Sequence, residues 1–144
     1  MPISIHPKPG QTLLCDFSEG FKEPEMVKSN RPVIIISNEI KGRKNLVTVV
    51  PLSTTKPSPI LSYHYLMPKQ SMPMLKHFQE YENWVKGDML YTVSFARLNL
   101  IKLGTRDSSG KRMYFKNRLG REQMKEIYTC ILHGLNLSRL TPYL

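Results

Sequence analysis

Two runs of apolar, β-branched residues, 33–36 and 46–50, most strongly limit how this chain can fold. Each run is apolar at consecutive positions, so a strand formed there would be buried on both faces. Pro32 stands where the first strand would begin and Pro51 where the second would end, and both are positions that a sheet tolerates. Residues 38–44 between them have the composition of a basic turn. The two runs therefore predict a pair of neighbouring strands.

Shorter segments with strand character accompany this pair. Alternation of apolar and polar residues predicts a first strand after a proline-rich turn and another after a Ser/Thr/Pro-rich loop. Residues 84–95 and 97–103 are expected to form either two strands or one bent strand pair. A short strand is expected at 111–115, beyond a glycine-containing turn. In chain order these segments are residues 12–17, 60–66, 84–95 with 97–103, and 111–115.

The last predicted element is a helix. Apolar residues recur at helical spacing from Met124 to Leu135, charged residues occupy the other side, and Gly134 fits a C-terminal stop. Residues 68–83 leave two alternatives open, a short helix from Met74 onward or a long loop. Many short strands with one terminal helix predict a mainly β fold, a small barrel-like sheet rather than a parallel α/β sheet.

Length and composition predict one domain over residues 1–144 with a single core. No apolar stretch approaches the roughly 20 residues that a membrane span needs. The first nine residues lack the pattern of a secretion signal, so we expect a cytoplasmic protein without membrane contact. Cys15 and Cys130 are expected to be reduced thiols, with Cys15 buried in a strand.

A formal net charge of +10 predicts an acidic partner, such as nucleic acid. The basic residues crowd into 97–121, where Asp107 is the one acidic residue, whereas 16–25 is locally acidic. Two interpretations remain open. A polyanion could lie across one face, or the basic surface could serve solubility alone.

Three polar segments stand at the ends of predicted strands and point to a phosphate-handling site. They contribute Arg31, a Ser53-Thr54 hydroxyl pair, and Lys86 with Asp88. The chain has no Gly-rich phosphate loop, no Cys/His cluster with metal-ligand spacing and no Gly-x-Ser-x-Gly turn. We therefore expect chemistry without a metal or cofactor.

Cleaving RNA without a metal needs a base for the ribose 2′ proton, an acid for the leaving 5′ oxygen, and donors for the phosphoryl charge. Arg31 has a planar fork suited to a phosphate and keeps its proton, so it would stabilise charge. Ser53 and Thr54 could donate hydroxyl hydrogen bonds to a non-bridging oxygen. Glu25 and Asp88 are both candidates for the base.

The order of the segments resembles the PemK/MazF (Kid-type) toxins of bacterial toxin–antitoxin modules. The resemblance is carried by residues 11–17, 24–28, 31–37, 49–55 and 85–88. It implies a small SH3-like β-barrel with a C-terminal helix, assembled as a homodimer. It also implies a metal-independent, sequence-specific endoribonuclease that cuts single-stranded RNA by 2′-OH attack, and an antitoxin whose acidic, disordered tail occupies the RNA groove.

The resemblance also implies roles for individual residues. Arg31 matches the catalytic arginine of the family, and Glu25 matches an acidic residue of the first loop. Ser53 with Thr54 matches the hydroxyl pair, although many members have threonine where Ser53 stands.

Two further features depart from the family pattern. Lys86 and Asp88 fall on an Arg-x-Asp pair, and Lys86 replaces a bidentate arginine with a point charge. Residues at about 63–83 form an insertion relative to compact members. The substrate contacts that we expect come from Lys28, Thr55, Lys56 and Trp84.

Two other functions stay open. A gyrase-targeting toxin on the same fold would rely on C-terminal residues that include a tryptophan, which residues 140–144 lack. A basic barrel could also bind RNA or DNA without cutting it, and salt-dependent binding without cleavage would then be observed.

Overall fold

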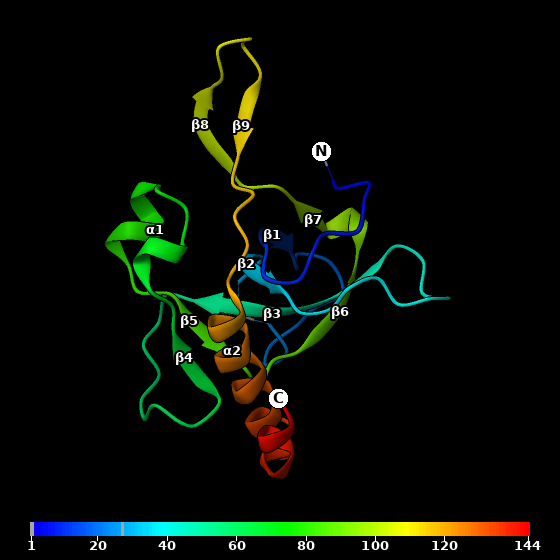
Figure 1. Cartoon of the computed structure of the whole chain (residues 1–144), viewed down its shortest axis with the longest axis vertical. Helices are drawn as coiled ribbons and strands as arrows, with labels where there is room; N and C mark the ends of the chain where they lie inside the picture. Colours follow the sequence, from blue (N-terminus) through cyan, green and yellow to red (C-terminus); the bar gives the residue numbers. More distant parts are fainter. Residues whose placement is uncertain (1, 27) are drawn as a thin grey trace.

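The protein is a bent antiparallel sheet with one long helix at its C-terminal end, seen here in a computed structural model that describes residues 2–26 and 28–144 (Figure 1). Val27, part of the sequence motif at 24–28, lies outside the described residues. Within the described residues, the strand order is β4-β5-β3-β2-β1-β7, and β6 pairs with β3. The strands of this sheet are β1 Thr12–Asp16, β2 Asn30–Ile35, β3 Leu46–Ser53, β4 His64–Leu66, β5 Trp84–Lys86, β6 Tyr91–Ser94 and β7 Leu98–Asn99.

The predicted central strand pair is present as β2 and β3, which align Val33 with Pro51 and Ile35 with Val49. β3 runs to Ser53, two residues beyond the proline at which we expected it to end. The Ile36 amide donates a hydrogen bond to the Thr48 carbonyl, and along an antiparallel ladder successive residues point their backbone groups alternately toward and away from the partner strand. The backbone nitrogen of Pro51, three residues after Thr48, therefore faces away from β2. There β3 changes partner from β6 to β5, and the missing proline N–H is tolerated.

Other elements differ from the sequence prediction in extent. Residues 60–63 remain loop, because the ladder with β5 begins at His64, although the Gly87 amide donates to the Tyr63 carbonyl at 2.8 Å. The undecided segment contains the short helix α1, Lys76–Glu80, and the 3₁₀ turn η1, Lys69–Ser71. The segments predicted at 84–95 and 97–103 are broken at two turns, which leaves β5, β6, the 3₁₀ turn η2 Phe95–Arg97, β7, and a further strand β8 Lys102–Arg106.

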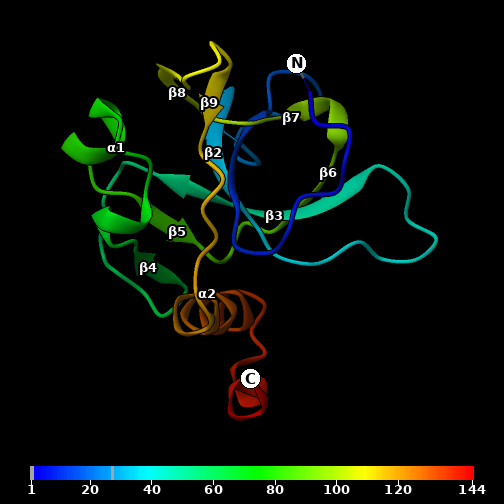
Figure 2. The same ribbon diagram turned by 45° about the horizontal axis from the view of Figure 1, so that its top comes forward.

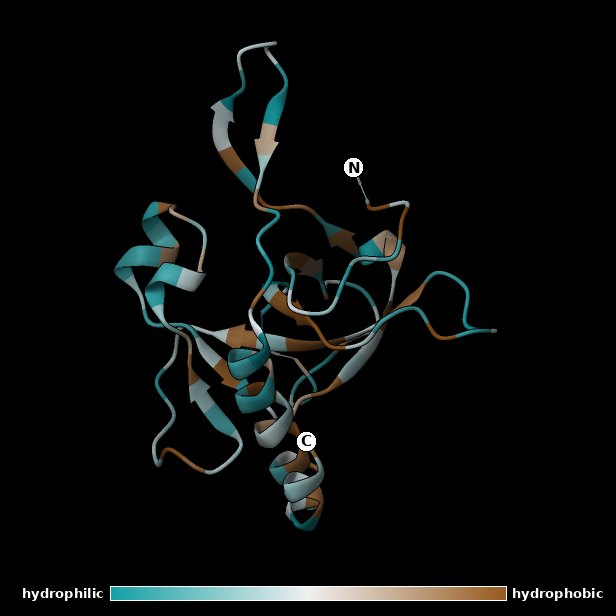
Figure 3. Ribbon diagram, viewed as in Figure 1, coloured by the Kyte–Doolittle hydropathy of each residue, from teal (hydrophilic) through white to brown (hydrophobic). Residues whose placement is uncertain are grey.

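The predicted C-terminal helix is confirmed as α2, Arg121–Gly134, and the 3₁₀ turn η3, Ser138–Tyr143, follows it. The sheet has a core on each face. On one face Ile34, Leu52 and Val85 pack with Ile127 and Ile131 of α2. In the concave bend a second cluster surrounds Leu13, Val33, Ile35 and Val49. Figure 3 shows the apolar central strands beside the largely hydrophilic α1. The predicted mainly β fold with a terminal helix is therefore confirmed.

Two glycines let α2 cross the end of β5 at backbone contact. A Cβ on Gly134 would lie 2.5 Å from the Gly87 carbonyl oxygen and 2.6 Å from the Asp88 Cα. A Cβ on Gly87 would lie 2.6 Å from the Cys130 carbonyl carbon. Neither position tolerates a side chain without moving the helix, so this crossing fixes the turn that carries Asp88.

One hairpin stands clear of the sheet. β8 pairs with β9, Arg112–Tyr114, to form a two-stranded ribbon that projects from the body in both views (Figures 1 and 2). Its base leads directly into α2. The hairpin therefore places part of the basic 97–121 segment at an exposed extremity of the molecule.

Candidate functional site

Arg31 lies in β2, where it is paired with Cys15 of β1. Continuing the β2–β3 register from the Val33–Pro51 pair by two residues places Arg31 opposite Ser53. Its Nη1 atom donates to the Leu52 carbonyl oxygen at 3.3 Å, and its Nε atom is buried without a hydrogen-bond partner. Burial lowers the pKa of the guanidinium from its ordinary value, and the group remains a cation at neutral pH.

The hydroxyl pair at the end of β3 has one buried and one exposed member. Ser53 is buried, and its Oγ accepts a hydrogen bond from the Thr55 amide at 3.1 Å, which orients the side chain. Thr54 is exposed, and the Lys28 Nζ lies 3.5 Å from its Oγ1. Lys28 therefore reaches across from the first loop to the end of β3. Lys56 follows on the exposed loop.

One pocket of about 210 Å³ is lined by Lys28, Arg31, Ser53 and Thr54. The opposite wall comes from the segment that we expected to be an insertion, through His77 and Phe78 of α1 and Asn83. The Asn83 amide nitrogen donates to the Phe78 and Tyr81 carbonyls at 3.1 and 3.3 Å, which ties that wall together. The remaining lining residues are Leu14, Asn30, Pro32 and Leu52.

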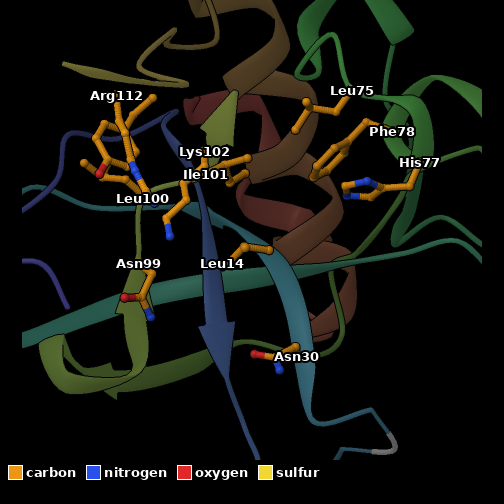
Figure 4. Close-up of a pocket in the computed structure, with 11 residues that line it drawn as sticks. Leu14, Asn30, Leu75, His77, Phe78, Asn99, Leu100, Ile101, Lys102 and Arg112 are labelled. Atoms are coloured by element: carbon orange, nitrogen blue, oxygen red, sulfur yellow. The ribbon is translucent and has the colours of Figure 1, made fainter. Parts of the chain in front are cut away.

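A larger groove of about 790 Å³ continues from this pocket. The two hollows share four lining residues, namely Leu14, Asn30, His77 and Phe78. Figure 4 shows Lys102 and Arg112 on one side of the larger groove and Phe78 and His77 on the other. An extended ligand could therefore occupy both without crossing a barrier.

The first loop, which carries Glu25, is anchored at both ends. Arg97 donates to the carbonyl oxygens of Asp16 and Glu19 at 2.8 and 2.6 Å. The Tyr91 hydroxyl donates a hydrogen bond to the Glu25 carbonyl oxygen. The Glu25 side chain itself is exposed. The backbone is therefore held while the carboxylate stays free to turn.

Tyr91 is a residue that the sequence reasoning missed. Its ring packs against Phe17 and Phe21, at centroid distances of 5.3 and 5.5 Å, and these two rings also contact each other. Burial raises the pKa of the Tyr91 hydroxyl; the positive charge of Arg31 opposes this rise, and Asp88 and Glu25 add to it. The charges of three predicted site residues therefore act on the pKa of the Tyr91 hydroxyl. A tyrosine at the start of a strand carries no sequence signal of such a role.

Lys86 and Asp88 lie apart from the Arg31 pocket and line neither hollow. Lys86 ends β5 opposite His64, and Asp88 lies in the turn that α2 fixes. Burial and the charge of Lys86 lower the pKa of His64, and Asp88 opposes them. Trp84 is 5% exposed, so its ring offers no open face to a base. Among residues 2–26 and 28–144, no group of three His, Cys, Asp or Glu side chains could hold a metal ion.

No helix within the described residues is long and apolar enough to cross a membrane. A protein-family model described as "PemK-like, MazF-like toxin of type II toxin-antitoxin system" matches residues 8–134. YifN of Escherichia coli (strain K12), itself uncharacterized, is 29% identical over 153 aligned positions, which cover 94% of this chain and 96% of YifN.

Two solved structures share the fold. The Mycobacterium tuberculosis toxin MazF-mt6 has a TM-score of 0.55 at 17% identity, covering 90% of this chain and 98% of that one. MazF (Form-I) from Deinococcus radiodurans has a TM-score of 0.60 at 12% identity, covering 92% of this chain and 99% of that one. At these identities the likeness concerns the fold alone, and it agrees with the predicted barrel type.

Proposed function

Because this chain belongs to the PemK/MazF family of type II toxin–antitoxin toxins, we propose that it is a metal-independent endoribonuclease that cuts single-stranded RNA. One observation carries the proposal. The Arg31 guanidinium lines a pocket beside the Ser53 and Thr54 hydroxyls with a buried Nε that has no partner. Among the described residues, no carboxylate lies within ion-pair distance of Arg31. An anion entering this pocket would meet an unneutralised cation and two hydroxyl donors.

The proposed reaction needs only groups that this chain and the RNA supply. The ribose 2′ oxygen attacks the adjacent phosphorus, and the bond to the 5′ oxygen breaks, which leaves a 2′,3′-cyclic phosphate and a 5′-hydroxyl end. A base takes the 2′ proton, and an acid returns a proton to the 5′ oxygen. Arg31 would stabilise the charge on the phosphoryl oxygens, with Ser53 and Thr54 as further donors.

Two carboxylates remain candidates for the base. Glu25 sits on the anchored loop with a free, exposed side chain. Asp88 sits in the turn fixed by α2, two residues after Lys86, which ends β5. Beyond the effect of burial, the charge of Arg31 lowers the pKa of the Tyr91 hydroxyl, and the charges of both carboxylates raise it. The variants Glu25→Gln and Asp88→Asn decide between them.

The partners follow from the charge of the chain and from the family. We propose that Lys28, Thr55 and Lys56 hold the RNA backbone around the pocket. We also propose a homodimer, and a cognate antitoxin whose acidic tail competes for the same basic groove. A net charge of +10 favours both acidic ligands.

A second function is favoured by one observation. Neither Asp88 nor Glu25 lines the pocket that holds Arg31. If no base reaches the bound phosphate, the protein would bind RNA without cutting it. Binding at low salt without new RNA ends would establish this alternative.

The decisive experiment incubates long single-stranded RNA with the protein in chelator and sequences the new 5′ ends. We expect cuts at one short motif, and a loss of at least about 100-fold in the rate for Arg31→Ala, since oxyanion donors contribute on that order. Arg139→Ala, which removes the same charge from the exposed turn η3, is the matched control and should cut normally. Equal cleavage by both variants would remove Arg31 from the mechanism, and intact RNA with the wild-type protein would refute the ribonuclease.

A further inference from the structure

A second, wider groove lies outside the pocket that contains Arg31. It runs between the β8–β9 hairpin and α1, and its volume is about 790 Å³. We propose that this groove binds the flanking nucleotides of the RNA strand whose scissile phosphate lies at Arg31. The inference rests on the proposed function for the identity of the strand. It adds an extended RNA path and a specific role for the hairpin.

Continuity between the two hollows is the first support. Leu14, Asn30, His77 and Phe78 line both of them, so a strand leaving Arg31 can enter the larger groove directly. The linear span of an RNA strand suits such a path better than a compact ligand would. The α1 segment forms one wall of both hollows and thereby joins them.

The charge of the hairpin is the second support. Lys102 and Arg112 line the groove, Arg106 lies opposite Arg112 in the ribbon, and Lys111 precedes Arg112 on the side of the turn. The one ion pair among the described residues is Lys76–Glu80 on α1, so none of these hairpin cations is neutralised by a carboxylate. Unpaired Lys and Arg side chains on a projecting ribbon are well placed to contact phosphates and release counterions.

Asp107, the acidic residue of the hairpin, forms hydrogen bonds within the turn of the hairpin. The Asp107 carboxylate accepts hydrogen bonds from the Ser109 amide and hydroxyl at 2.9 and 2.6 Å and from the Lys111 amide at 3.0 Å. These bonds close the turn at the tip. The Asp107 carboxylate is therefore engaged by groups of the turn itself.

The chemistry of the lining favours a nucleic acid over an acidic peptide. Single-strand binding sites combine cations that follow the backbone with flat rings on which bases stack. Tyr114 on the hairpin and the exposed His77 on α1 supply rings, while Leu14, Leu100 and Ile101 provide an apolar floor. The side-chain amides of Asn30 and Asn99 add donors and acceptors for base edges.

The test measures binding of RNA that cannot be cut, so that it is independent of catalysis. Fully 2′-O-methylated single strands of about 4 and about 12 nucleotides, within the range of single-strand sites, are titrated by fluorescence anisotropy. The variant Lys102→Ala/Arg112→Ala removes two groove cations, and both side chains are exposed, so folding should be preserved. The control Lys125→Ala/Arg139→Ala removes one lysine and one arginine from the C-terminal end of the molecule.

We expect the groove variant to bind the longer strand about tenfold or more weakly than the control does, with a salt slope smaller by about 1.4, the value for two lost phosphate contacts. Binding of the shorter strand should change less. Equal affinity of both variants for the longer strand would overturn the inference. Charge reversal by Lys102→Glu/Arg112→Glu should deepen the loss, and no further loss would also overturn it.

The outcomes separate this inference from the proposed function. Cleavage by the wild-type protein, together with unchanged binding by the groove variant, would support the ribonuclease activity and refute RNA binding in the groove. Weakened binding in the groove variant, together with no cleavage by the wild-type protein, would keep the groove and refute the ribonuclease. If instead an acidic peptide, titrated in the same way, distinguishes the two variants while the RNA does not, the groove is a protein-binding surface.

Discussion

The Arg31 side chain, at the start of β2, is only partly exposed. Its buried Nε without a partner is an unsatisfied donor, which is unfavourable in the free protein. A phosphate oxygen could satisfy that donor and would regain part of this free energy on binding. At the scale of the residue, burial thus makes Arg31 a poor stabilising group and a good anion ligand.

Buried thiols and phenols predict a pH dependence of stability at the same scale. Burial raises the pKa of Cys15 from 9.0 to about 12 and that of Cys130 to about 11. Burial also raises the pKa of Tyr65, Tyr91 and Tyr128. Each group holds its proton more tightly in the folded state, so its contribution is complete below the unfolded pKa and is lost as the pH rises through the folded value.

Between pH 7 and about 8 we therefore expect these groups to leave the free energy of unfolding unchanged. Above about pH 9 the free energy of unfolding should fall, by up to about 1.4 kcal/mol per pH unit for each group. Urea unfolding at a series of pH values measures this. For each protein, the free energy of unfolding at alkaline pH is compared with that at neutral pH. The decrease should be smaller for Cys15→Ala than for the wild-type protein. A free energy that rises with pH would contradict the assignment.

At the scale of elements, the expected insertion at about 63–83 forms a wall of the site. α1 and Asn83 line the Arg31 pocket and, through His77 and Phe78, join it to the larger groove. The helix α2, which shares a core cluster with Phe78 of α1, holds the turn with Asp88 through the Gly87–Gly134 crossing. Two elements distant in sequence therefore position the groups that surround β3.

The Gly87–Gly134 crossing gives a prediction for stability. Gly134→Ala would place a Cβ 2.5 Å from the Gly87 carbonyl oxygen, so we expect a loss of about 1–3 kcal/mol, the usual range for overpacking. Gly120→Ala is the control, because a Cβ there meets nothing within 4 Å, and its cost should stay below about 1 kcal/mol. Chemical unfolding compares the two. Equal losses would show that the helix adapts at this contact.

At the scale of the whole molecule, the charge balance dominates. The net charge is +10, and a single ion pair, Lys76–Glu80 at 3.8 Å, occurs among the described residues. Most of the positive charge is thus available to an external polyanion. A long single strand and an acidic antitoxin tail would compete for it, as proposed above for a toxin of this family.

This charge predicts a steep salt dependence of RNA affinity. If about five phosphates are contacted, the slope of log K against log salt should be about −3.5, which lowers the affinity about 100-fold between 50 and 200 mM salt. Anisotropy titrations with 2′-O-methylated RNA measure the slope. An uncharged morpholino strand of the same sequence is the control and should bind far more weakly. A flat salt response would show that the basic surface serves solubility alone.

Much of the fold could be predicted because its signals are local. The apolar runs around Ile34 and Val49 and the helical spacing from Met124 onward require burial on particular faces, and they became β2, β3 and α2. Strand extents were less predictable. β3 passes Pro51 because its pairing partner changes there, and residues 60–63 stay outside the ladder between β4 and β5. Both depend on neighbours far away in the sequence.

The residue types of the candidate site, a cation at Arg31 and hydroxyls at Ser53 and Thr54, could be read without a structure, because their chemistry and their place near strand ends are local properties. Which of these groups meet depends on the folded chain. The pairing of β2 with β3 brought Arg31 into one pocket with Ser53, the fold brought Tyr91 to the Glu25 loop, and it placed Lys86 and Asp88 outside the pocket. Register and helix crossing depend on the packing of the whole sheet, and no short stretch of sequence carries that information.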